Sequence, residues 1–256
     1  MCTLLIATGV FDGPGLFVIS NRDEALDRGA MPPALHRRRQ LGVLAPIDSR
    51  AGGTWIGLNA VGVFAAITNR FGGIDQAHHQ SRGRLVFDAL KEESAAAAAQ
   101  QLRAISPRRH NGFHLVIADA TEAYLVCNSG RRLAVRRLHR GYHVISERSF
   151  GAAPSARLRR LERRLKQLGD EWSEDHRHRW EEWMREHDNA DPLEGACVHL
   201  DGANYGTRSS TIIELKETWR FAHAPGPPCT TAYREYSEEL RRLKMTAPAT
   251  PAENGK

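Results

Sequence analysis

The chain has few cysteines, few aromatic residues and no long hydrophobic run. Its 256 residues include four cysteines, and no two of them have C-x-x-C spacing, so the sequence predicts neither a zinc knuckle nor a disulfide framework. No apolar stretch approaches the roughly 20 residues that a membrane-spanning helix needs. The first residues show neither a basic segment nor a small-residue cleavage site. We therefore expect no signal peptide and a reducing, cytoplasmic location.

Charge is segregated along the chain. The formal net charge is +6, but residues 131–166 carry twelve Lys and Arg against two glutamates, and residues 170–194 carry ten acidic residues against three arginines. Opposed faces of neighbouring elements can therefore neutralise each other. The basic stretch lacks the interleaved aromatic side chains on which nucleotide bases stack, so we expect no nucleic acid as a partner. An RNA-binding or scaffolding role is the least favoured alternative.

Short apolar runs predict a β-rich chain with antiparallel sheets. Runs at 2–7 and 16–20, separated by turn-forming residues 9–15, predict an N-terminal hairpin. Glycine-punctuated strands follow, a meander is expected over 113–146, and strands return over 197–223. Hairpins rather than βαβ units connect these strands. Two layers of sheet flanked by helices would bury them economically.

Three helices are predicted between these strands. Alanine-rich residues 81–105 suit one helix, which Pro107 ends. Residues 155–168 place leucines at helical spacing, with the arginines on the solvent side. Residues 172–187 form the third helix. One face of this helix carries a stripe of large side chains, which we interpret as core packing rather than as a ligand site. The stripe consists of Trp180, Trp183, Met184 and His187.

The length favours one large domain, since compact domains usually take about 100–200 residues. We expect a single domain over residues 1–244. The Pro- and Ala-rich residues 245–256 are expected to form a disordered tail.

Cys2 is the first candidate for chemistry. A small second residue permits removal of the initiator Met1, which would leave cysteine as the first residue of the mature chain. Its free α-amino group, with a reference pKa of about 7.7–8.0, could then accept the thiol proton. Such a nucleophile requires no histidine. The competing interpretation is a small core residue on a strand.

Asn21, Arg22, Asp23 and Glu24 are consecutive polar residues at the end of the second predicted strand. Alternation places Asn21 and Asp23 on one side and Arg22 and Glu24 on the other. The hairpin brings this cluster beside the start of the first strand, where a carboxylate or guanidinium could orient the amine and hold the thiolate. A charged turn that ends a strand is the alternative.

Two further stretches combine backbone freedom with polar side chains. Residues 52–59 read Gly-Gly-Thr-Trp-Ile-Gly-Leu-Asn and lead to Thr68 and Asn69. Glycines admit a substrate close to the backbone, and a strand-end Asn can contribute to an oxyanion hole. A tight turn with Trp55 in the core is the alternative. In residues 205–211, Tyr-Gly-Thr-Arg-Ser-Ser-Thr, Arg208 could bind a carboxylate or polarise the nucleophile.

These four motifs, in this order, resemble the NRDE family, also called the transport and Golgi organisation family, and they cover most of the chain. That family is similar to the N-terminal-nucleophile hydrolases. The resemblance implies an α+β fold, an αββα four-layer sandwich with antiparallel sheets. The motif order is also similar to that of the choloylglycine hydrolases and penicillin V acylases.

The resemblance implies roles for individual residues. Cys2 would be the nucleophile, with its own α-amine as the base, and Asp23 would orient that amine. Asn69 would contribute its backbone N–H to the oxyanion hole, and Arg208 would support the charged intermediate. Arg22 is a further catalytic candidate, although the arginine of the acylases lies further ahead of the aspartate. Substrate binding is expected from Asn21, Trp55, Asn59, Glu147 and Tyr205.

Glu147 departs from the family pattern. Many members carry a Leu-Ser-Asn stretch after the meander, and its Asn would donate to the oxyanion, whereas residues 144–148 here read Val-Ile-Ser-Glu-Arg. A carboxylate repels an oxyanion unless it is protonated or neutralised by a neighbour such as Arg148. Loss of one such donor typically costs about 10²–10³ in rate. The departure predicts a different substrate geometry or an absence of hydrolysis.

Two functions follow from these observations. The first is a cysteine amidohydrolase that cleaves a small-molecule C–N amide bond through a Cys2 thioester, with neither a metal nor a cofactor. The second is a non-catalytic binding or trafficking protein for haem or an acyl- or lipid-type hydrophobic molecule, because family members have been associated with such roles and histidines are available as axial ligands. Either function has a small molecule as its partner and needs no membrane span. Oligomeric state has no signature in the sequence.

Overall fold

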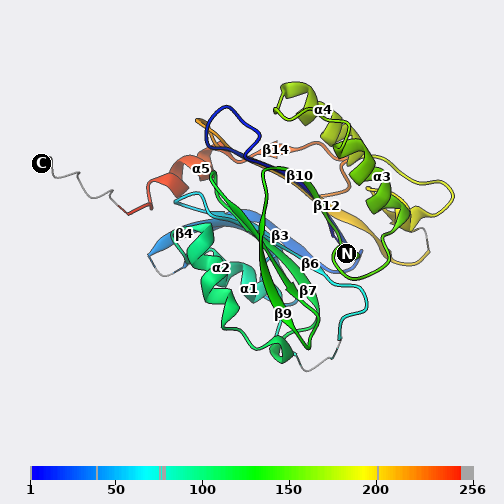
Figure 1. Ribbon diagram of the computed structural model, residues 1–256, viewed down its shortest axis with the longest axis horizontal. Helices are drawn as coiled ribbons and strands as arrows, with labels where there is room; N and C mark the ends of the chain where they lie inside the picture. Colours follow the sequence, from blue (N-terminus) through cyan, green and yellow to red (C-terminus); the bar gives the residue numbers. More distant parts are fainter. Residues whose placement is uncertain (1, 39, 75, 77–78, 201, 249–256) are drawn as a thin grey trace, which may run out of the picture.

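The computed structural model describes residues 2–38, 40–74, 76, 79–200 and 202–248. Within them, two antiparallel seven-stranded sheets stack on each other (Figure 1). The first sheet contains β1 (Cys2–Thr8), β2 (Leu16–Ala25), β10 (Gly141–Ile145), β11 (His199–Leu200), β12 (Tyr205–Leu215), β13 (Arg220–Ala224) and β14 (Arg234–Glu235). Its strand order is β10-β1-β2-β12-β13-β14, with β11 paired to β12.

The second sheet keeps its strands in chain order. It contains β3 (Ala30–Arg38), β4 (Leu41–Asp48), β5 (Ile56–Asn59), β6 (Phe64–Asn69), β7 (Phe113–Ala118), β8 (Ala123–Asn128) and β9 (Leu133–Leu138). The α-helices in the described part of the chain are α1 (Gly83–Ala89), α2 (Ala95–Arg103), α3 (Ala156–Leu165), α4 (Glu174–Trp183) and α5 (Ser237–Lys244), and two short 3-10 helices span Pro107–Arg109 and Pro192–Glu194.

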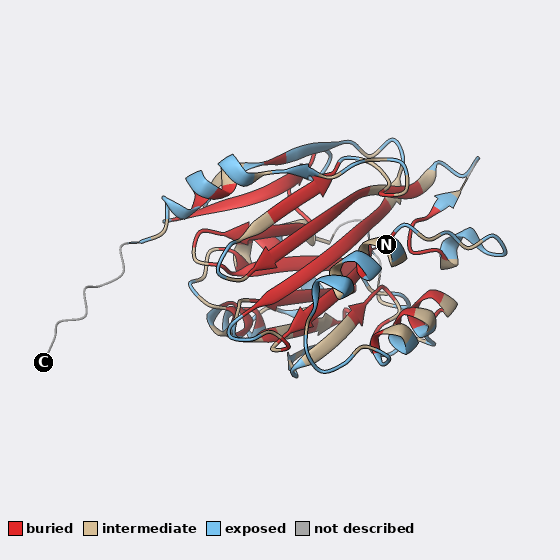
Figure 2. Cartoon of the chain, turned by 90° about the horizontal axis from the view of Figure 1, so that it is seen from above, coloured by how far each residue is buried: buried red, intermediate tan, exposed pale blue. Residues whose placement is uncertain are grey.

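Helices cover the outer faces of the two sheets, so the predicted αββα sandwich is confirmed. α1 and α2 pack on the second sheet, and α3 and α4 lie on the first (Figure 1). Figure 2 shows the buried strands running through the interior, with exposed surface on the outward sides of the helices. No helix in the described ranges is long and apolar enough to cross a lipid bilayer.

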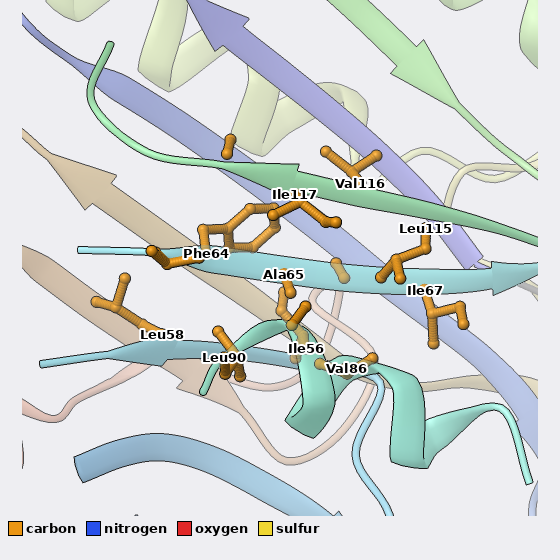
Figure 3. Packing of buried hydrophobic residues seen from close by; sticks show 14 of the residues in the cluster. Ile56, Leu58, Phe64, Ala65, Ile67, Val86, Leu90, Leu115, Val116 and Ile117 are labelled. Atoms are coloured by element: carbon orange, nitrogen blue, oxygen red, sulfur yellow. The ribbon is translucent and has the colours of Figure 1, made fainter. Parts of the chain in front are cut away.

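Alternation along β1 gives the first sheet two buried faces. Leu4 and Ile6 join the apolar cluster between the sheets, whereas Leu5 and Ala7 join the cluster under α3 and α4. On the second sheet, Figure 3 shows side chains of β5 meeting α1 and the residue that follows it; these are Ile56, Leu58, Val86 and Leu90. Burial on both faces leaves the sheet ends as the places where polar groups can meet a ligand.

The helix predicted over 81–105 is in fact two helices. Asn59 donates two hydrogen bonds from Nδ2, to the carbonyl oxygens of Leu90 (3.2 Å) and Glu92 (2.8 Å), and so holds the break between α1 and α2. Ser94 then caps α2, because its hydroxyl accepts a hydrogen bond from the Ala97 N–H at 3.1 Å. A cap inside an alanine-rich stretch was the sequence signal for the break.

The proline-marked stretch around residues 31–40, which carried no strand prediction, contains β3. It lies at the edge of the second sheet, where Pro32 and Pro33 remove no ladder hydrogen bond. The register with β4 shifts between Met31 and Ala34, so the prolines coincide with a bulge.

The described part of the chain contains one more helix after the predicted strands. This helix, α5, has no counterpart among the predicted elements and packs against β4 and β13. After it, the Thr246 hydroxyl accepts a hydrogen bond from the Gly42 N–H at 3.1 Å. Residues 249–256 of the predicted tail lie outside the described residues, and the 1–244 domain boundary stays a prediction.

Opposite charges on neighbouring segments do pair, as the charge pattern predicts. Arg160 lies 3.5 Å from Asp188, and Arg164 lies 2.7 Å from Glu186. The basic stretch in α3 therefore faces part of the acidic stretch that follows α4. These pairs are partly exposed and contribute little stability each.

Leu161 tests the packing of α3 on the first sheet. It is fully buried under the helix, so Leu161→Ala is expected to lower the free energy of unfolding by about 2–5 kcal/mol, since a cavity is left behind. Urea denaturation measures the change. The exposed Arg163→Ala, two residues away, serves as the control and is expected to stay within about 0.5 kcal/mol of wild type. Equal stability of the two variants would contradict this packing.

Candidate active site

Cys2 lies at the start of β1, directly opposite Arg22 of β2 in the antiparallel register. Its side chain lines a cleft of about 380 Å³ between the ends of the two sheets. The first sheet contributes Cys2 and the end of β2 to the cleft. The second contributes Ile67 and Asn69 of β6, and Trp55 directly precedes β5. Residues near the start of α1, including Arg82 and Gly83, close the third side.

Arg22 is held across the gap between the sheets. Its Nη2 donates to Oδ2 of Asp48 at 2.9 Å, and its guanidinium carbon lies 4.4 Å from the centre of the Trp55 ring. Its buried Nη1 has no hydrogen-bond partner among the described residues. A donor that is fixed in place and unpaired beside Cys2 can bind a negative charge that develops in the cleft.

Asp48 is the anchor for two arginines. Its carboxylate accepts hydrogen bonds from Arg22, from Nε of Arg28 at 2.8 Å and from the backbone N–H of Ala51 at 2.9 Å. Burial raises the pKa of Asp48, but these hydrogen bonds outweigh it and leave the pKa below its ordinary value. The anchor therefore stays ionised at neutral pH.

Asp23 points to the other side of β2, as alternation predicts for neighbours of Arg22. Its Oδ1 accepts a hydrogen bond from the Thr207 hydroxyl at 2.7 Å, and Oδ2 lies 3.4 Å from Nη1 of Arg157. The Tyr205 hydroxyl donates to its backbone carbonyl at 3.2 Å. Burial raises the pKa of this carboxyl, and Arg157 opposes the shift.

Arg157 is the centre of this polar layer, although the sequence analysis placed the arginines of its helix in solvent. It is 1% exposed, and its Nη2 donates to both carboxylate oxygens of Glu147, at 3.2 and 3.1 Å. Arg157 lies four residues before Leu161 and so shares the buried face of α3. Glu147 is therefore neutralised, but by Arg157, since Arg148 stacks 3.7 Å over the Phe71 ring.

The Cys2 thiol is protonated at neutral pH. Burial raises its pKa, and the nearby Arg22 opposes that shift. A thiol in this state needs a base before it can act as a nucleophile. Among the described histidines, His79 lies in the lining of the same cleft.

The floor of the cleft depends on two glycines. A Cβ on Gly53 would lie 2.8 Å from the backbone of Gly83, and a Cβ on Gly83 would lie 2.9 Å from the Thr54 carbonyl oxygen. The Thr54 N–H donates to the Gly83 carbonyl at 3.2 Å. This close approach joins the Gly-Gly-Thr-Trp stretch to α1 and positions Trp55 in the cleft wall.

Three of the predicted residues, Asn21, Asn59 and Arg208, lie outside the lining of the cleft. Asn21 donates at 2.8 Å to the carbonyl oxygens of Met184 and Ala196. Asn59 holds the α1–α2 break. Arg208 lies in a β-bulge of β12 between Thr207 and Ser209, and its buried Nε has no hydrogen-bond partner in the described part of the chain. Asn69 does line the cleft.

The profile of the family described as Transport and Golgi organisation 2 matches residues 1–222. The chain belongs to this family. Among curated relatives, the Transport and Golgi organization protein 2 homolog of Bos taurus is 30% identical over 123 residues, which is 46% of this chain and 44% of that protein. The Mus musculus homolog is 28% identical over the same shares. The match thus spans less than half the length of either relative.

Three solved structures with a similar fold are an acylase, an acid amidase ortholog and a bile acid hydrolase. Penicillin V acylase from Agrobacterium tumefaciens is 12% identical with a TM-score of 0.59, covering 93% of this chain and 88% of that one. A Caenorhabditis elegans N-acylethanolamine-hydrolyzing acid amidase ortholog is 11% identical with a TM-score of 0.54, covering 83% and 92%. A cysteine-to-alanine mutant of conjugated bile acid hydrolase from Clostridium perfringens is 12% identical with a TM-score of 0.52, covering 95% and 94%. At these identities the likeness establishes the fold alone.

Three contributors to this site of the Transport and Golgi organisation 2 family member were missed in the sequence. Asp48 is the last residue of β4, a strand that the sequence pattern does not predict, and Thr207 stands in the Tyr-Gly-Thr-Arg motif without a predicted role of its own. The four-residue spacing between Arg157 and Leu161 indicates that Arg157 lies on the buried face of α3. The other arginines of that helix obscure this indication.

Arg157→Met tests the buried ion cluster. The variant leaves Asp23 and Glu147 buried without their countercharge, so we expect the free energy of unfolding to fall by about 3–5 kcal/mol. Urea denaturation at pH 7 provides the measurement, with the exposed Arg159→Met of the same helix as the control. Adding Glu147→Gln to Arg157→Met should restore part of the loss. A stability of Arg157→Met equal to that of the control would refute the cluster.

The burial of His114 predicts that the free energy of unfolding decreases as the pH falls. Its Nδ1–H donates to the Ser146 carbonyl at 3.0 Å, next to Glu147, and burial lowers its pKa from 6.5 to about 4. The unfolded chain therefore binds the proton first as pH falls, so stability present above pH 6.5 is lost progressively down to about pH 4. The loss amounts to about 3 kcal/mol.

Urea denaturation of wild type and His114→Gln at pH 7 and pH 5 isolates this contribution from that of His223, whose pKa burial also lowers to about 4. The variant should lose less stability between the two pH values than wild type does. The exposed His139→Gln is the control. An unchanged pH slope in His114→Gln would contradict the assignment.

Proposed function

We propose that this protein is a cysteine N-terminal-nucleophile amidohydrolase that cleaves a small-molecule C–N amide bond through a thioester on Cys2. One observation carries the proposal: the Cys2 side chain lines a cleft together with Arg22, Asp23 and Asn69. Burial keeps the thiol protonated, and the α-amine that Met1 removal would expose supplies the base within the same residue.

The proposed reaction has two halves. In acylation, the α-amine takes the thiol proton, Cys2 Sγ attacks the amide carbonyl carbon, and the amine leaves with a proton returned from the α-amine. In deacylation, the same amine takes a proton from water, which attacks the thioester and releases the acid and the free thiol. Asp23, clamped by Thr207 and Arg157, orients the α-amine.

The developing oxyanion needs donors that are already in place. We assign this role to the Asn69 backbone at the end of β6 and to the unpaired Nη1 of Arg22. Arg208 supports the charge from the neighbouring strand. Glu147 is held by Arg157, so it does not act as the family's oxyanion Asn would, and its repulsion of the oxyanion is offset.

The cleft wall favours a neutral amide with an apolar acyl group. Trp55 and Ile67 give it an apolar side. The arginines that line it are Arg22, Arg28 and Arg82, and the carboxylates are Asp23, Glu24 and Asp48. Because these charges balance, they give no net attraction for an anionic substrate.

The mass of the intact purified protein is the first test. We expect a mass lacking Met1. Incubation with penicillin V, a conjugated bile acid and an N-acylethanolamine, the substrates named for the similar structures, should then add an acyl mass to Cys2 in at least one case. Cys2→Ala should abolish both adduct and turnover, whereas Cys127→Ala should retain them.

Two outcomes would overturn the proposal. Complete retention of Met1 removes the base, and full turnover by Cys2→Ala removes the nucleophile. Either result would favour the non-catalytic alternative, which predicts saturable binding of haem or a fatty acyl ligand, read as a Soret shift or as quenching of tryptophan fluorescence.

A further inference from the structure

Four potential metal ligands meet away from the cleft, on the outer side of the first sheet. They come from the loop after α4, the entry to β11 and the loop after β13; they are His187, Cys197, His199 and Cys229. One ligand atom from each residue lies within 4.8 Å of the other three. Cys197 is buried, Cys229 is half-buried, and the two histidines are exposed.

The spacing of the ligand atoms is close to that of a tetrahedral site. Sγ of Cys197 lies 3.5 Å from Sγ of Cys229 and 3.6 Å from Nε2 of His199, which is 3.3 Å from Sγ of Cys229. In a zinc site with Zn–S of about 2.3 Å and Zn–N of about 2.0–2.1 Å, adjacent sulfurs lie about 3.8 Å apart and a sulfur and a nitrogen about 3.6 Å. Adjustments of a few tenths of an ångström would complete the site.

The orientation of His187 also fits a ligand. Its Nδ1 lies 3.0 Å from the Cys197 carbonyl oxygen. A carbonyl can only accept, so Nδ1 carries the proton and Nε2 keeps its lone pair. Histidine ligands of metals usually donate their second ring N–H to a backbone carbonyl in this way, which fixes the tautomer.

We propose that His187, Cys197, His199 and Cys229 form a structural Zn²⁺ site. Two thiolates and two imidazoles in tetrahedral spacing match the ligand set of closed structural zinc sites. On binding, each cysteine thiol releases its proton to the solvent as its Zn–S bond forms, and nothing is oxidised or reduced. The sequence predicts no metal site because no two cysteines have C-x-x-C spacing, and these four ligands come from separate segments.

This zinc site goes beyond the proposed hydrolysis and would support it from a distance. Between the ligands Cys197 and His199, the Val198 N–H donates to the Thr207 hydroxyl at 2.8 Å. That hydroxyl in turn donates to Asp23. The Gly195 carbonyl accepts from Nη1 of Arg157 at 3.2 Å. Zinc would thus fix the segment to which Thr207 and Arg157, two partners of the Asp23 carboxylate, are bonded.

The test uses the full-length protein, stripped with a chelator under reducing conditions and titrated with Zn²⁺ and, separately, with Co²⁺. We expect about one equivalent of tightly bound Zn²⁺ per chain by elemental analysis. Co²⁺ should give the intense visible bands of a tetrahedral ion and a thiolate-to-metal charge-transfer band. Zinc should raise the melting temperature and protect two thiols from alkylation.

Cys229→Ser and His199→Gln are the informative variants, because neither residue is fully buried. Each should weaken Zn²⁺ binding by more than about 100-fold. Loss of a group that only hydrogen-bonds to a metal ligand already costs up to about 100-fold, and loss of a ligand itself costs more. Cys127→Ser, which removes a thiol on β8 outside the cluster, should bind as wild type does. These readouts do not involve hydrolysis, so they stand or fall independently of the proposed activity.

Three results would overturn the site. The first is substoichiometric zinc in the wild type after titration. The second is equal zinc affinity in wild type, Cys229→Ser and His199→Gln. The third is a disulfide between Cys197 and Cys229 that persists under reducing conditions and is detected by peptide mass mapping.

Discussion

The burial of Arg157 between Asp23 and Glu147 is the interaction on which the polar end of the first sheet depends. It joins α3 and the residues just after β10 to β2, which lies more than a hundred residues earlier in the sequence. Removing a guanidinium and two carboxylates from water is costly, and their attraction repays this only where the remaining groups are also bonded. Here Thr207 satisfies one carboxylate and the Gly195 carbonyl accepts from the arginine. The cluster therefore fixes position more than it adds stability.

Local chemistry explains what could be predicted from the sequence. The N-terminal hairpin follows from two short apolar runs and a glycine-rich turn, and the structure pairs Cys2 with Arg22 across it. Because side chains alternate along a strand, the opposite directions of Arg22 and Asp23 followed from their order alone. Family resemblance then supplied the four-layer architecture, which the comparisons confirm. The roles of the individual catalytic residues remain predictions.

Long-range pairing explains what could not be predicted. Asp48 holds Arg22 only because β4 of one sheet faces β2 of the other, and no spacing in the sequence encodes that meeting. Asn59 resembles a site residue, yet its oxygen accepts from the Val61 and Val63 N–H groups and its amide bridges two helices. A buried amide serves backbone groups as well as it serves a substrate. Residue type alone does not distinguish these roles; the partners do.

The segment from Gly195 to Val198 shows how an irregular stretch can support a precise site. Some of its backbone groups pair with other backbone groups, as where the Cys197 N–H donates to the Glu186 carbonyl, and side chains from elsewhere bind several of the others. Arg157 binds the Gly195 carbonyl, Asn21 binds that of Ala196, and Thr207 binds the Val198 N–H. Asn21 is therefore part of the site's support although it lies outside the cleft. Arg157 and Thr207 also bind the carboxylate of Asp23, so any displacement of this segment changes the position of that carboxylate beside the proposed nucleophile. The geometry of the cleft is therefore coupled to the outer layer of the fold.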